Sequence, residues 1–94
     1  MKNRLPGDPQ RITPELRADI TAAVETALEK IHGRQAIDYG TSSLGYLELA
    51  QNEPDNERYL RSLRNSLALL AYIAEVRLQP DVASQLRALL RRLP

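Results

Sequence analysis

Residues 60–78 of this 94-residue chain read LRSLRNSLALLAYIAEVRL, and this stretch decides the fold. Apolar residues recur in it at alternating spacings of three and four, which places them on one face of an α-helix. They are Leu60, Leu63, Leu67, Leu70 and Ala74. The other faces carry a second apolar set, namely Leu69, Tyr72, Ile73 and Val76. A helix this apolar must be enclosed on most sides, so we expect its cover to come from neighbouring helices and from a second copy of the chain.

The length of the chain sets its domain organisation. With 94 residues, the chain has enough apolar surface for one core but not for two, which predicts a single domain. We place this domain over residues 13–94. Residues 1–12 contain Pro6, Gly7 and Pro9 and little periodic apolar content, which predicts a flexible N-terminal arm.

A first helix is predicted to begin at Thr13, with Thr13 as the N-cap and Pro14 in the first helical position. Its apolar stripe consists of Leu16, Ile20, Ala23, Val24, Ala27, Leu28 and Ile31. Gly33 then supplies the left-handed residue that ends many helices. This pattern predicts a helix from residue 13 to about residue 32.

The segment between the first helix and residue 60 is harder to interpret. Residues 34–43 fit either a single helical turn or a short extended piece, because apolar residues there are followed by Gly40. Thr41, Ser42 or Ser43 is expected to cap a short second helix over residues 44–51. Pro and Asp residues at 52–55 form the next break, which starts the third helix near residue 54 and lets it run to about residue 78.

The last helix is predicted from residue 80 or 81 to residue 92, with an apolar side formed by Val82, Leu86, Leu89, Leu90 and Leu93. The chain therefore belongs to the all-α class, as a compact bundle of about four helices, two long and two short, completed by homo-oligomerisation. We expect the long first and third helices to pack as an antiparallel pair, with the short helices laid along them.

Charge is distributed unevenly along the chain although the net charge is only +1. Residues 35–57 carry five acidic and no basic residues, whereas residues 58–94 carry seven arginines against Glu75 and Asp81. The chain has no Cys, which fits a reducing compartment. No apolar run follows the basic N-terminal residues, and the longest uncharged run is about half the ~20 residues that span a bilayer. We expect a cytoplasmic protein with no membrane association.

An enzyme is disfavoured by the inventory of reactive residues. His32 is the only imidazole and is placed at a helix end, away from the hydroxyls of residues 41–43. Glu25 and Glu29 lie one turn apart without any further ligand spacing, which is typical of a solvated helix face. The sequence predicts no catalytic residues, no cofactor and no metal.

Nucleic-acid binding is the alternative function. A helix-turn-helix is disfavoured, because the start of the third helix would bring Asp55 and Glu57 to the phosphates. A better candidate is the outer face of the last helix, with Arg87, Arg91 and Arg92. The same arginines are better explained as partners of acidic residues in the first helix or the middle segment.

The favoured function is a small non-enzymatic protein–protein interaction module of the adaptor, regulatory or inhibitor type that self-associates as a homodimer. Tyrosine is common at binding hot spots, and Tyr39 and Tyr46 are predicted to flank a loop. The predicted partner-binding residues are Tyr39, Tyr46, Leu69, Tyr72, Ile73 and Val76. The expected partners are another protein and a second copy of this chain.

Overall fold

The computed structural model describes residues 12–94, and within this range the chain forms four helices and no strand. They are α1 (Pro14–Lys30), α2 (Arg34–Asn52), α3 (Glu57–Val76) and α4 (Pro80–Arg92). The all-α class and the bundle architecture are therefore confirmed. The predicted arm lies outside the described residues except for Ile12, which is partly buried against the core.

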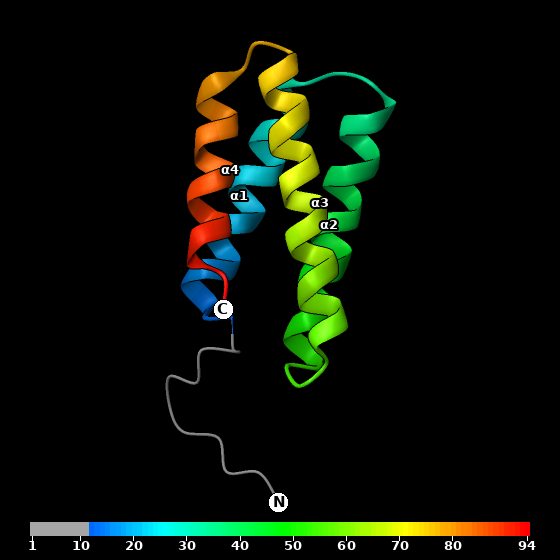
Figure 1. Ribbon diagram of the computed structural model, residues 1–94, viewed down its shortest axis with the longest axis vertical. Helices are drawn as coiled ribbons and strands as arrows, with labels where there is room; N and C mark the ends of the chain where they lie inside the picture. The colour runs from blue at the N-terminus through cyan, green and yellow to red at the C-terminus, as the bar shows by residue number, and fades with distance from the viewer. Residues whose placement is uncertain (1–11) are drawn as a thin grey trace, which may run out of the picture.

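The helices run alternately up and down, and each lies beside its neighbour in the chain (Figure 1). The most extensive packing joins α2 to α3, followed by α3 to α4, and α1 closes the bundle between α2 and α4. The predicted antiparallel pairing of α1 with α3 is wrong. These two helices run in the same direction at diagonal positions, because short connections make consecutive helices antiparallel neighbours.

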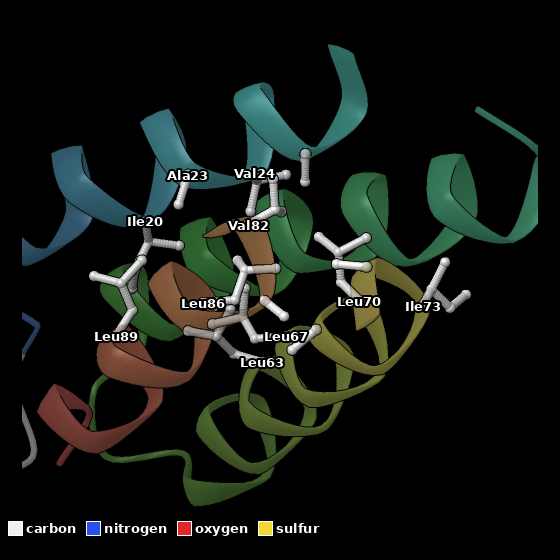
Figure 2. Packing of buried hydrophobic residues seen from close by; sticks show 14 of the residues in the cluster. Ile20, Ala23, Val24, Leu63, Leu67, Leu70, Ile73, Val82, Leu86 and Leu89 are labelled. Atoms are coloured by element: carbon white, nitrogen blue, oxygen red, sulfur yellow. The ribbon is translucent and has the colours of Figure 1, made fainter. Parts of the chain in front are cut away.

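The core is built mainly from leucines of α3 and α4 and branched residues of α1 (Figure 2). Its largest fully buried aliphatic side chains are Ile20, Val24, Ile31, Leu63, Leu67, Leu70, Val82 and Leu86. The stripe predicted for α1 is confirmed, with only Leu28 left partly exposed. Burial of side chains of this size stabilises the folded state by about 1.5–3 kcal/mol each.

Both ends of α1 are defined by local chemistry. The hydroxyl oxygen of Thr13 accepts a hydrogen bond from the backbone N–H of Leu16 at 3.1 Å, which confirms the predicted N-cap. The helix ends at Lys30, and Gly33 has a φ of 126°. This positive φ favours glycine, as expected. Gly33 is, however, the N-cap residue of α2 and does not end α1.

The prediction of a short second helix is wrong. α2 has 19 residues, and Thr41, Ser42 and Ser43 lie inside it instead of capping it. Ser43 is fully buried and donates a hydrogen bond from its hydroxyl to the carbonyl of Tyr39 at 2.8 Å. Polar and glycine residues lower the intrinsic helix propensity of this segment, but packing against α1 and α3 overrides it.

The structure corrects the boundaries of the third helix and confirms those of the fourth. α3 covers 20 residues and begins after Asn56, whose side-chain oxygen accepts from the N–H of Arg58. Three helices of 17, 19 and 20 residues and one of 13 replace the two long and two short helices expected. None of these helices combines the length and apolar character needed to cross a membrane within residues 12–94.

Candidate interaction surface

α3 presents two chemically different faces. Its inner face is fully buried at Leu63, Leu67 and Leu70, which contact the aliphatic core. Its outer face is exposed along the whole helix and consists of Arg58, Arg61, Asn65, Ala68, Leu69, Tyr72, Glu75 and Val76. We call this set the α3 outer face. It is charged or polar in its first half and largely apolar in its second half.

Three of the four apolar residues expected to be covered are exposed. The exposed fractions are 43% for Leu69, 60% for Tyr72 and 58% for Val76, whereas Ile73 is 7% exposed. The expectation that neighbouring helices wrap α3 on nearly all sides therefore fails within a single chain. The bundle has only two neighbours to place against α3, and they leave its outer side open. These three residues form the exposed apolar part of the α3 outer face.

A further exposed apolar residue lies where α3 ends. Leu78 is 83% exposed and has a φ of 61°, in the left-handed region that most residues avoid. The N–H of Gln79 bonds to the carbonyl of Ala74 at 2.8 Å, and that of Leu78 to the carbonyl of Glu75 at 3.1 Å. This pair of bonds is the Schellman turn, which normally has glycine at the position of Leu78. Sequence reasoning missed this residue because leucine gives no signal for such a turn.

Tyr39 and Tyr46 do not flank a loop as predicted. Both lie inside α2, and both are half-buried against the hydrophobic core. The glycines and hydroxyl residues between them favour a break in the sequence pattern, but the structure continues the helix through them. Their rings pack within the subunit, so most of their surface is already used.

The C-terminal arginines are divided between ion pairs and solvent. Arg87 donates two hydrogen bonds to the carboxylate of Glu75 at 2.8 and 3.2 Å, which joins α4 to α3. The guanidinium of Arg87 holds the pKa of Glu75 below its ordinary value, and the carboxylate raises that of Arg87. Arg92 pairs with Asp19 of α1 at 2.8 Å. Arg91 is exposed and forms no ion pair with the other described residues.

These pairs bear on the predicted alternatives. The acidic residues of the first helix were one expected set of partners, and Asp19 belongs to it, whereas Glu75 of α3 does not. Arg64, in the first half of α3, donates to the backbone carbonyl of Pro94, which follows the end of α4. The α4 arginines thus pair with different neighbouring helices, Arg87 with α3 and Arg92 with α1.

The reactive side chains stay apart. His32 is exposed in the connection between α1 and α2, while Ser43 is buried and bonded to its own helix. Glu25 and Glu29 are exposed on α1. Across residues 12–94, no group of three or more His, Asp or Glu side chains lies in an arrangement that would hold a metal ion. His32 therefore does not act as a base for the buried hydroxyl of Ser43.

Comparisons with protein-family models, with curated proteins and with solved structures found no match to this chain.

Proposed function

We propose that this chain is a non-enzymatic helical module that binds proteins, including a second copy of itself, through the α3 outer face. The observation that carries the proposal is the exposure of Leu69, Tyr72 and Val76 on one side of a single helix. Large apolar side chains that are grouped in this way are typical of binding surfaces, whereas isolated ones are ordinary. Tyr72 adds a ring with a polar hydroxyl, which suits an interface that forms and dissociates.

Some of the predicted partner-binding residues are buried within the subunit and are therefore not accessible to a partner. Ile73 is buried in the core of the subunit, and the two tyrosines of α2 are half-buried. Three exposed residues of α3 therefore carry the proposal. Nucleic-acid binding is less well supported, because Arg87 and Arg92 already pair with carboxylates that would compete with phosphates.

Self-association is tested by the mass of the protein in solution. Sedimentation or light scattering from low to high micromolar concentration is expected to give about twice the chain mass of 10.6 kDa. The triple variant Leu69→Gln, Tyr72→Gln, Val76→Gln should be monomeric over the same range. Its helix content should stay unchanged, because all three side chains are exposed in the subunit.

A matched control distinguishes a specific interface from nonspecific hydrophobic association. Ile37 on α2 is 56% exposed, close to the values of the three α3 residues. Ile37→Gln removes a similar amount of exposed apolar surface and should leave the dimer intact. A wild-type protein that stays monomeric throughout, or a triple variant as dimeric as the wild type, would refute the proposal.

A further inference from the structure

Along the middle of the α3 outer face, exposed residues recur at a regular spacing of their own, separate from that of the buried residues. Arg61, Asn65, Ala68, Tyr72 and Glu75 are separated by four, three, four and three residues, and all five are exposed. This is the a/d spacing of a coiled-coil seam, which keeps residues in line along one side of a helix with about 3.6 residues per turn. We call these five residues the outer seam.

The two charged ends of the outer seam lie at equal distances in sequence from Ala68 and carry opposite charges. Arg61 and Glu75 each lie seven residues from Ala68, on its N-terminal and C-terminal sides. Asn65 and Tyr72 lie three and four residues from it. A second copy of α3 laid antiparallel and centred on Ala68 brings Arg61 opposite Glu75 twice, with Asn65 one residue out of register from Tyr72 of the second copy. A parallel copy would instead oppose Arg61 to Arg61 and Glu75 to Glu75.

We infer that two copies of this chain associate through α3 in an antiparallel arrangement, with the two-fold axis passing close to Ala68. This inference rests on the self-association proposed above and assigns its geometry. Charge complementarity selects the antiparallel direction and the register, since like charges oppose each other in the parallel one. The small side chain of Ala68 lets the two helices approach closely at the axis.

Glu75 has room for the contact that this arrangement requires. Arg87 bonds to both of its oxygens, yet 57% of the Glu75 side chain remains exposed. A carboxylate has about four lone-pair sites, so it can accept from a second guanidinium. Leu69 and Val76 lie beside the outer seam and would be covered from both sides of the axis, because an isologous interface uses every contact twice.

A single cysteine at the axis tests the geometry directly. The natural chain has no Cys, so a Cys introduced at position 68 can form a disulfide only with its own copy. Disulfides need Cα atoms about 4.4–6.8 Å apart, which only residues close to a two-fold axis satisfy. Ala68→Cys is expected to oxidise to a covalent dimer at least tenfold faster than the control Ala18→Cys, an exposed alanine on α1.

The outcomes separate this inference from the proposed function. If light scattering shows a dimer but Ala68→Cys cross-links no faster than Ala18→Cys, the antiparallel α3 geometry is refuted and self-association stands. If both variants and the natural chain are monomeric, both proposals fail. Rapid cross-linking of Ala68→Cys in a chain that is dimeric before oxidation supports both.

A charge exchange provides a second measurement that does not depend on cysteine chemistry. Arg61→Glu puts like charges at both ends of the outer seam and is expected to raise the dimer Kd about tenfold. Adding Glu75→Arg to this variant restores opposite charges and should recover most of the lost affinity. A double variant no tighter than Arg61→Glu alone would contradict the proposed register.

Discussion

α2 and α3 pack against each other and are almost equal in length, at 19 and 20 residues, yet they are helical for different reasons. α3 has a side-chain N-cap at Asn56, an acidic first turn and a leucine-rich inner face. α2 has no side-chain cap, no acidic residue in its first turn and no basic residue in its last. Its buried residues are small: Ala36, Gly40, Ser43 and Ala50, with Leu47 as the one large member.

This difference shows where the stability of each helix originates. α3 is specified by its own sequence, because apolar periodicity and capping agree. α2 is specified by its neighbours, since small residues let other helices come close enough to stabilise a segment of low propensity. The two helices should therefore differ in their response to substitution, and this difference can be measured.

The largest effect is expected in the inner face of α3. Leu67→Ala removes a fully buried side chain and leaves a cavity, so the free energy of unfolding should fall by about 2–5 kcal/mol. In α2 the buried Ser43 offers a smaller truncation: Ser43→Ala removes only a hydroxyl that bonds to its own helix, and should change the free energy of unfolding by no more than about 1 kcal/mol. Denaturant titration of both variants measures the difference. Equal losses would break the distinction between the two helices.

The glycines of α2 give the next largest contrast. A Cβ added at Gly40 would lie 2.7 Å from Cδ2 and 3.1 Å from Cγ of Leu28, so Gly40→Ala must displace the Leu28 side chain or separate α1 from α2. Overpacking should exceed the gain in helix propensity and destabilise the fold by about 1–2 kcal/mol. A Cβ at Gly45 would meet nothing within 4 Å, and Gly45→Ala should stabilise the fold by about 0.5–1 kcal/mol.

The same denaturant titrations check the two glycine variants. If close contact with α1 positions the first half of α2, Gly40→Ala should lower the free energy of unfolding and Gly45→Ala should raise it. Stabilisation by both substitutions would mean that α2 is limited by propensity alone and that Gly40 has no packing role.

The contrast between α2 and α3 also explains how far the fold was predictable. Caps and stripes predicted α1 and α4 nearly residue by residue, since Thr13, Pro14 and Pro80 act within their own turns. The first half of α2 was not predictable, because the contact of Gly40 with Leu28 joins residues whose proximity depends on the whole bundle. Local signals cannot report a stabilisation that comes from tertiary packing.

The candidate surface shows a similar limit. The sequence indicates that α3 is apolar on several faces, but the burial of Ile73 and the exposure of the adjacent Tyr72 depend on where the neighbouring helices lie. The outer seam has a regular spacing that is readable from the sequence alone. Analysis of apolar periodicity does not detect it, because Arg, Asn and Glu are not apolar. Only the structure shows that all five residues are exposed.

A smaller effect is expected at the turn after α3, the one place where this helix departs from its own sequence preferences. Leu78 has a φ of 61°, and a left-handed conformation costs a non-glycine residue about 1–2 kcal/mol. Leu78→Gly should raise the free energy of unfolding by about 1 kcal/mol once the greater freedom of glycine in the unfolded chain is subtracted. Thermal unfolding measures this, and Leu78→Ala, which keeps the strain, is the control. No gain over Leu78→Ala would show that the turn is unstrained.

The smallest effect is expected at the ion pair between α3 and α4. Because the pKa of Glu75 is lower in the folded chain than in the unfolded one, the pair stabilises the fold at neutral pH, and this stabilisation is lost as the pH falls through the lowered pKa. The raised pKa of Arg87 has no effect in this range, because its charge is lost only in strong alkali. NMR titration of the Glu75 carboxyl should therefore show a higher pKa in Arg87→Gln than in the natural chain. Arg91→Gln is the matched control, since Arg91 forms no ion pair with the rest of the described chain. An unchanged pKa in Arg87→Gln would mean that the ion pair does not persist in solution and does not contribute to the joining of α3 and α4.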